Sequence, residues 1–164
     1  MSAHHDTVLT TAAKRARDAG LPLGGLLTPA ESWTLFSAGE IELVDTRTHA
    51  ERDLIGYVPG SVSIEWYDYP AKKRNDGFLE QLRAKVDPQR PVAHQPVDRR
   101  VQHFRLELHR RRSGVRSRHA AELATAHGYA AAFNILEGFE GDRNAQGQRV
   151  IAGWKVAGLP WRQD

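Results

Sequence analysis

The sequence predicts an α/β fold, with a mainly parallel sheet of about five strands and helices on both faces. Three observations predict it. Short apolar runs typical of strands alternate with segments that carry helical patterns and helix caps. No internal repeat or low-complexity tract interrupts this alternation. The length of 164 residues, with 40% hydrophobic and 26% charged residues, suits one domain with a substantial core.

Caps and glycines mark the helix boundaries. Thr28 and Glu31 form a Thr-x-x-Glu capping box. Thr48 and Glu51 form a second box of the same kind. Glycines follow the helical patterns and are expected to end them. We therefore predict helices over residues 7–19, 28–39, 48–56, 78–86 and 117–127.

The predicted strands are shorter than the helices. Ligands of open parallel sheets bind beyond the carboxyl ends of the strands, so polar residues at those ends are candidates for a site. Residues 45–47 and 111–116 occupy such positions. An apolar segment from Trp154 to Trp161 closes the chain. Strand-like runs cover residues 41–44, 61–64 and 131–136.

The composition excludes several classes of protein. No apolar run approaches the roughly 18–20 residues that span a bilayer. The N-terminus lacks the pattern of a secretory signal, so we expect a cytoplasmic protein that does not use a membrane. The absence of cysteine excludes disulfides, iron–sulfur clusters and thiolate zinc sites. We expect no metal or other cofactor, because no standard metal-ligand spacing relates the histidines at 94, 103, 109 and 119.

Positive charge is concentrated in one segment. The formal net charge is +3, yet residues 90–119 contain nine arginines against only Asp98 and Glu107. This imbalance places any anionic partner at that segment. One hypothesis is therefore a basic binding module, residues 90–119, for nucleic acid or an acidic protein. Such binding would weaken steeply as ionic strength rises.

Residues 111–117 have the composition of an anion-binding loop that leads into a helix. Gly114 permits unusual backbone angles, and N–H groups of such a loop converge on an anion. The helix N-terminus adds positive potential. The competing interpretation is an ordinary helix start with solvated arginines. The candidate anion-binding residues are Arg112, Ser113, Gly114, Val115 and Arg116.

Several motifs together resemble those of the single-domain rhodanese-like sulfurtransferases. The family's Asp-x-Arg is matched by Asp45-Thr46-Arg47, and its Gly-His-Ile-Pro-Gly by residues 56–60, with a tyrosine in place of the usual histidine. The family's active-site loop reads Cys-Arg-Ser-Gly-x-Arg-Ser, so Arg111 stands at the position of the nucleophilic cysteine. Further similarity lies in residues 134–141 and 158–161, and the resemblance covers residues 26–92 and 112–161.

The resemblance implies transfer of sulfane sulfur, from a donor such as thiosulfate to a thiol or cyanide, through an enzyme persulfide. Arginine, with a pKa above about 12, is no substitute nucleophile for cysteine. We therefore predict an inactive homologue in which a small sulfur-containing anion or a thiol acceptor still binds. Asp45 and Arg47 are expected to be structural supports that join loops by charge-assisted hydrogen bonds. Residues 1–25 are expected to form a helix and connector, and residues 26–164 the rhodanese-like domain.

Residues 93–111 depart from the family pattern. The family places a buried apolar strand directly after the position of Val92, whereas this chain continues with polar residues and Pro96. One explanation is a genuine basic insertion, with residues 104–108 supplying the central strand. The other is a segment out of register with its ancestral reading frame. Sequencing the gene across codons 90–115 separates them, because a clean frame shared with close relatives excludes the second.

Overall fold

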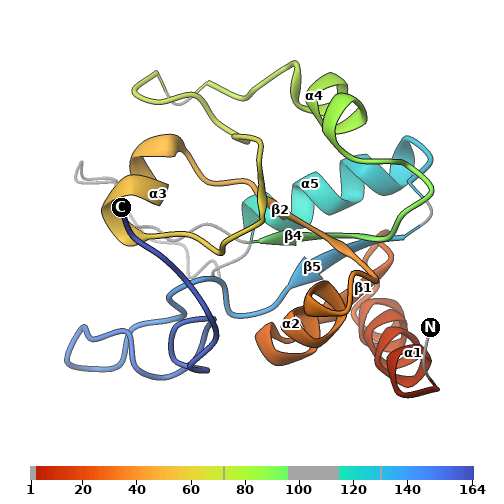
Figure 1. Cartoon of the computed structure of the whole chain (residues 1–164), viewed down its shortest axis with the longest axis horizontal. Coiled ribbons are helices and arrows are strands. Elements are labelled where there is room, and N and C mark those ends of the chain that lie inside the picture. Colours follow the sequence, from red (N-terminus) through yellow and green to blue (C-terminus); the bar gives the residue numbers. More distant parts are fainter. Residues whose placement is uncertain (1–2, 72, 96–114, 130) are drawn as a thin grey trace.

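The computed structural model describes residues 3–71, 73–95, 115–129 and 131–164 as an α/β arrangement (Figure 1). The order of strands in the sheet is β1-β5-β4-β2-β3, and all four neighbouring pairs are parallel. The predicted fold class is thereby confirmed. The strands are β1 (Gly25–Leu27), β2 (Glu42–Asp45), β3 (Val62–Ser63), β4 (Val92–Gln95) and β5 (Ala132–Ile135).

The helices lie close to the predicted ranges. Both capping boxes are confirmed: the side chain of Thr28 accepts from the N–H of Glu31, and Thr48 does the same with Glu51. The first helix begins earlier than predicted, since the Thr7 hydroxyl donates back to the Ala3 carbonyl instead of capping the helix. The helices are α1 (Ala3–Asp18), α2 (Pro29–Ser37), α3 (His49–Ile55), α4 (Phe78–Lys85) and α5 (Val115–Ala126).

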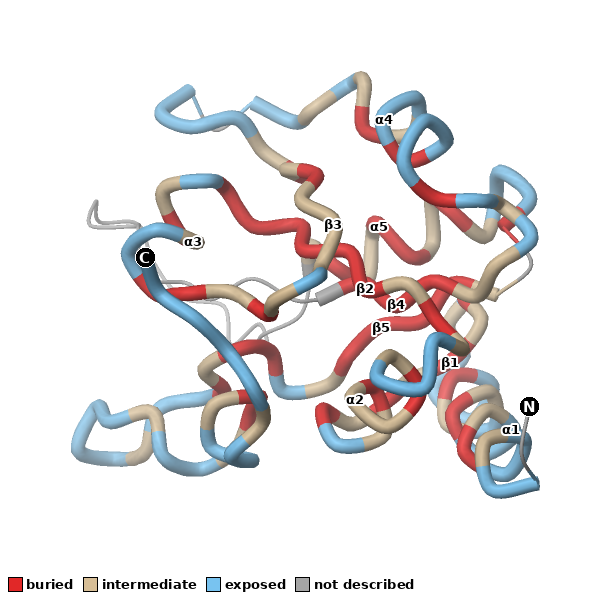
Figure 2. The backbone as a smooth tube through the Cα atoms, viewed as in Figure 1, coloured by how far each residue is buried: buried red, intermediate tan, exposed pale blue. Residues whose placement is uncertain are grey.

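Both faces of the sheet are covered, as the strand colours in Figure 2 show. Successive residues of a strand point to opposite faces. Val92 therefore packs on one side with Phe78 of α4 and Ala120 of α5. Its neighbour Ala93 packs on the other side with side chains from α1, α2, α3 and the C-terminal segment. The sheet thus separates two apolar clusters: α4 and α5 cover the first, α2 and α3 cover the second, and α1 contributes to both.

The central strand lies directly after Pro91. β4 pairs with β2 on one side and β5 on the other, so residues 92–95 hold the central place that one explanation had given to residues 104–108. Residues 104–108 lie outside the described residues. The polar side chain of His94 did not prevent strand formation, because both neighbours offer backbone partners and tertiary pairing overrides local propensity.

The edge strand β1 was not predicted: Gly25 was assigned to the connector, and Leu26 and Leu27 were given no strand. Its pairing with β5 depends on close backbone approach, since a Cβ on Gly24 would lie 2.8 Å from the Ala132 nitrogen. A strand of three residues that follows a glycine-containing run is too short to show the alternation by which strands are predicted from sequence.

The C-terminal segment returns to α3, as the blue trace in Figure 1 shows. Arg162 forms an isolated antiparallel bridge with Tyr57, and the amide of Gln163 donates to the Leu54 carbonyl. Trp154 is fully buried within this segment, and its indole N–H donates to the Pro160 carbonyl at 2.9 Å. Among the described helices, none has the length and apolar character needed to cross a bilayer.

Candidate functional site

The predicted site residues divide into described and undescribed ones. Asp45 ends β2, Arg47 lies just beyond it, and Arg116 is the second residue of α5. Val115 begins α5. These positions gather at the carboxyl edge of the sheet, where ligands of such sheets bind. Arg111, Arg112, Ser113 and Gly114 lie outside the described residues, so their roles remain predictions.

Asp45 and Arg47 form a buried ion pair. Neither side chain is exposed, and the guanidinium of Arg47 donates to the two carboxylate oxygens at 2.9 and 2.7 Å. Arg52 of α3 donates to the same carboxylate at 2.8 Å. Burial alone would raise the pKa of Asp45, but the two guanidinium groups and the hydrogen bonds from Arg47 outweigh it and hold the pKa below its usual value. Asp45 is therefore a permanent anion at neutral pH.

Arg47 also connects separate parts of the chain. Its guanidinium donates to the Gly56 carbonyl at 2.7 Å and lies 4.2 Å from the centre of the Phe139 ring. The pair thus joins the end of β2, the end of α3 and the C-terminal region. This geometry is what a structural support requires, and it leaves no side-chain surface of Asp45 or Arg47 open to a ligand.

Arg116 is tied to the start of α3. Its guanidinium lies 3.1 Å from a carboxylate oxygen of Glu51, a residue whose other contacts form the Thr48 capping box. The same guanidinium lies 5.9 Å from the ring centre of Tyr67. One quarter of the Arg116 side chain remains exposed, at 24%. The sequence identified Glu51 only as a cap partner; its pairing with Arg116 crosses 65 residues and needed the fold.

Ser117 anchors the first turn of α5 to the sheet. Its hydroxyl donates to the Asn134 side-chain oxygen of β5 at 2.6 Å, and both residues are buried. Asn134 lies opposite His94 in the pairing of β4 with β5. The head of α5 is thus held on two sides, by Glu51 of α3 and by Asn134 of β5.

His94 is fully buried beside this anchor. Its ring lies 6.1 Å from the Phe78 ring, and neither ring nitrogen has a hydrogen-bond partner among the residues that the structure describes. Burial lowers the pKa of His94 to about 3, so the imidazole is neutral at neutral pH. A fully buried imidazole offers no contact with solvent, which makes His94 a feature of the core.

Histidine and carboxylate side chains do not assemble a metal site within the described ranges: no group of three or more such residues is close enough to hold an ion. His103 and His109 lie outside those ranges.

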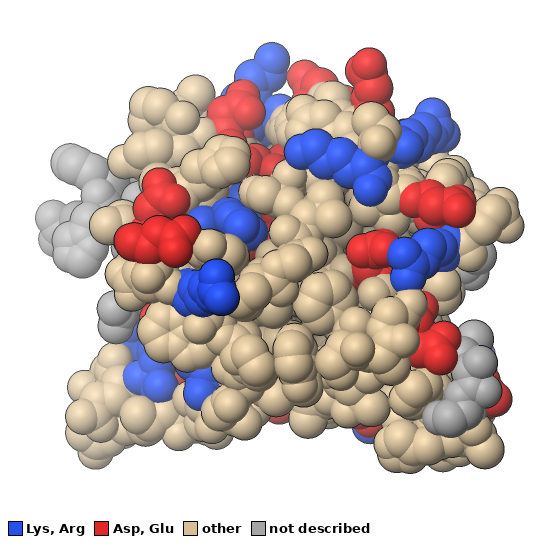
Figure 3. Space-filling model, viewed as in Figure 1, with Lys and Arg blue, Asp and Glu red and all other residues tan. Residues whose placement is uncertain are grey.

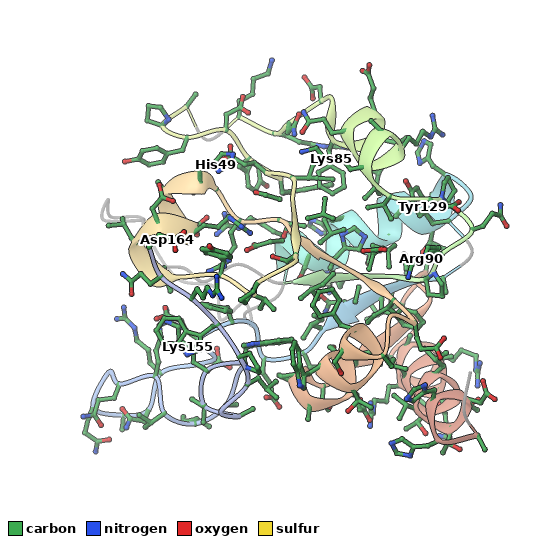
Figure 4. All side chains as sticks on the ribbon, in the orientation of Figure 1. His49, Lys85, Arg90, Tyr129, Lys155 and Asp164 are labelled. Carbon is green, nitrogen blue, oxygen red and sulfur yellow. The ribbon has the colours of Figure 1, made fainter. Side chains whose placement is uncertain are left out.

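The described arginines of the basic segment are all paired. Arg90 pairs with Glu42, Arg116 with Glu51 and Arg118 with Glu122. Arg90 precedes β4 and lies near Tyr129, away from Lys155 and Asp164 (Figure 4). Arg90 and Arg116 thus lie at opposite ends of the central strand. On the face drawn in Figure 3, acidic and basic side chains are interspersed, with no large region of one sign.

Comparison with known proteins agrees with this architecture. The model of the rhodanese-like domain family matches residues 28–145. The solved structure of Rv0390 from M. tuberculosis is 35% identical, with a TM-score of 0.68, and the match covers 85% of this chain and 97% of that one. A polysulfide-sulfur transferase homodimer from Wolinella succinogenes is 20% identical with a TM-score of 0.54, covering 97% of this chain and 90% of its own, and at that identity the likeness concerns the fold.

No curated protein matches the chain. The family match nevertheless spans well over half of the residues, and it includes Asp45 and Arg47 at the end of β2 and Arg116 at the start of α5. By its sequence and its fold, this chain belongs to the rhodanese-like domain family.

Proposed function

We propose that this protein is a rhodanese-like domain that binds a small sulfur-containing anion, such as thiosulfate, without transferring sulfur. The observation that carries the proposal is the absence of any cysteine in a chain whose α5 head is still held as an anion site requires. Arg111 takes the family's cysteine position and supplies a positive charge in place of a nucleophile.

The chemistry of sulfur transfer explains why the thiol matters. A thiolate attacks the sulfane sulfur of thiosulfate, the sulfur–sulfur bond of the donor breaks, and sulfite leaves with the bonding electrons. The enzyme persulfide then passes its outer sulfur to cyanide or a thiol, which restores the thiolate. A guanidinium is protonated at neutral pH and offers no electron pair for the first step. Binding of the sulfur donor is therefore the one step of the reaction that this chain can carry out without a thiol.

The held α5 head supports retained binding. Arg116 keeps a partly exposed guanidinium at the carboxyl edge of the sheet, and Glu51 fixes its position. α5 has 12 residues, long enough for its N-terminus to contribute positive potential. The proposed ligand contacts at Arg112, Ser113 and Gly114 complete this site by resemblance to the family.

The test separates binding from turnover. Thiosulfate:cyanide sulfur transfer is measured for the unmodified chain and for Arg111→Cys, and thiosulfate binding is measured by calorimetry at low salt. We expect binding without turnover in the unmodified chain. Turnover by the unmodified chain, or no binding of thiosulfate, contradicts the proposal. Sulfur transfer by Arg111→Cys would further show that the rest of the site is competent.

A matched pair of variants locates the binding. Arg116→Gln and Arg90→Gln each remove one positive charge and one ion pair with a glutamate, at opposite ends of β4. The proposal expects a several-fold loss of thiosulfate affinity only in Arg116→Gln. Equal losses would instead favour the basic binding module over residues 90–119, which predicts salt-sensitive binding of nucleic acid or an acidic protein.

A further inference from the structure

An open hollow lies between α5 and the segment that follows β3. Its volume is about 420 Å³, within the range of small-molecule sites, and six side chains of the described residues line it. Those residues come from two segments about fifty positions apart, so no local sequence motif predicts the hollow. The lining residues are Trp66, Tyr67, Arg74, His119, Glu122 and Leu123.

The floor and walls of the hollow are largely aromatic and aliphatic. Trp66 is held in place by an edge-to-face contact with Phe78, at 5.0 Å between ring centres. Tyr67 and Leu123 are partly buried and pack against the same core cluster. A flat ligand body therefore meets the partly exposed Tyr67 and Leu123 and the small part of Trp66 that is exposed, 4% of the residue, and planar groups pack favourably against an aromatic ring.

Arg74 supplies a positive charge that no carboxylate neutralises. Its guanidinium lies 5.1 Å from the centre of the Trp66 ring, and no acidic group within the described ranges forms an ion pair with it. Its sequence neighbour Lys73 pairs with Asp76 instead. A guanidinium without an acidic partner is suited to a carboxylate or sulfonate, which can accept two parallel hydrogen bonds from it.

The negative charge of Glu122 in the hollow is balanced by an ion pair with Arg118. Glu122 lies 3.4 Å from the guanidinium of Arg118, one turn earlier on α5. Arg74 therefore sets the sign of the charge that the hollow offers to a ligand. The combination of an uncompensated guanidinium and aromatic walls specifies both the charge and the shape of a ligand.

We propose that this hollow binds a small organic anion with a planar body, its carboxylate or sulfonate on Arg74 and its body against Trp66, Tyr67 and Leu123. The residues of the hollow belong to the side of α5 and to the segment after β3, and the hollow adjoins the proposed thiosulfate site at Tyr67, whose ring lies 5.9 Å from the guanidinium of Arg116. The inference does not require thiosulfate binding or any property of Arg111.

Benzoate is the probe, with benzenesulfonate, cyclohexanecarboxylate and acetate as comparisons. Binding is followed by calorimetry and by amide shifts in two-dimensional NMR of the unmodified chain. We expect millimolar or tighter binding of benzoate and benzenesulfonate, several-fold weaker binding of cyclohexanecarboxylate, and none of acetate. Amide shifts are expected at residues 66–67, 74 and 119–123. Shifts confined to other residues, or equal affinity for the planar and saturated carboxylates, overturn the proposal.

A matched pair of variants tests the charge. Arg74→Gln should weaken benzoate binding about tenfold, the effect of losing a charged hydrogen-bond donor. Lys73→Gln removes the same charge one residue away, outside the lining, and should change the affinity less than twofold. Equal effects of the two variants contradict the proposal. If Arg74→Gln does not fold, the NMR map on the unmodified chain still decides the outcome.

Discussion

At the scale of single residues, the buried polar groups determine which substitutions change the stability of this fold most. His94 places two nitrogens without a described partner in the core beside Phe78, whereas Arg47, although its Nη1 also lacks a described partner, forms a buried ion pair with Asp45 through two hydrogen bonds. An unpartnered buried polar group costs about 1–3 kcal/mol, and a buried charge deprived of its partner costs more. Replacing His94 by an apolar residue should therefore raise the free energy of unfolding, and removing the charge of Asp45 should lower it.

The His94 imidazole should make stability depend on pH. Its pKa is about 3 in the folded protein and ordinarily 6.5, so below pH 6.5 the unfolded chain binds a proton that the folded chain does not. Stability should therefore fall as pH decreases below 6.5, by up to about 1.4 kcal/mol per pH unit. Urea unfolding between pH 7.5 and 5 measures this, above the range in which carboxyl groups titrate.

His94→Leu should raise stability at pH 7 by about 1–3 kcal/mol and reduce the pH slope. The matched control is His4→Gln on the exposed face of α1, which should leave the slope unchanged. A slope that persists in His94→Leu would show that another group causes it.

Asp45→Asn should destabilise the protein by about 3–5 kcal/mol, because it leaves the fully buried Arg47 guanidinium without a counter-charge. The control is Asp18→Asn, which breaks the exposed Lys14 pair and should cost under about 0.5 kcal/mol. Both are read from urea unfolding at pH 7. Similar costs for the two variants would remove Asp45 and Arg47 from their supporting role.

At the scale of elements, α5 is positioned by contacts that other elements provide. Glu51 of α3 combines two functions, since it completes a helix cap and pairs with Arg116. Glu31 of α2 shows the same combination, with its own capping box and a pair with Arg15 at 2.7 Å. In this fold, a capping glutamate is also a joint between two helices.

A double-mutant cycle on Glu51→Gln and Arg116→Gln should give a coupling free energy of about 1–2 kcal/mol, because the Glu51 carboxylate is 3% exposed. Glutamine preserves the hydrogen bond of the cap, so the cycle isolates the charge. The exposed pair of Lys14 and Asp18 serves as reference, with an expected coupling below about 0.5 kcal/mol. Coupling as weak as the reference would mean that α3 does not hold α5.

At the scale of the whole molecule, the sequence predicted what local chemistry determines. The Thr28 and Thr48 caps act within four residues, and both helices appear where predicted. β4 was missed because its strand state comes from β2 and β5, which lie far away along the chain. The candidate site follows the same division. Family resemblance indicated Arg116, but its pairing with Glu51 and the hollow beside α5 exist only in the folded chain.

The C-terminal segment closes the molecule through one tight contact. Gly56 has a φ of 94°, and a Cβ there would lie 2.4 Å from the Arg162 carbonyl oxygen. Gly20 also has a positive φ, 63°, but has open space around it. Gly56→Ala should therefore cost about 2 kcal/mol or more beyond the roughly 1 kcal/mol of backbone strain expected in Gly20→Ala.

Thermal and urea unfolding compare these two alanine variants. Equal costs would show that the C-terminal segment adjusts without loss. Release of the segment should also increase proteolysis after residue 154 in Gly56→Ala alone, since Tyr57 and Leu54 would no longer hold it.

The contacts of α5 with α3 and β5 affect whether the loop that precedes α5 can be replaced. Glu51 and Asn134 belong to elements other than the linker between β4 and α5, so both of these contacts are formed outside that linker. We therefore expect that the sequence between Gln95 and Val115 can be exchanged for loops of other length and chemistry, with or without a thiol. The unfolding temperature then reports on the rest of the fold, and activity reports on the loop. The head of α5 would then serve as a fixed attachment point for loops of different chemistry.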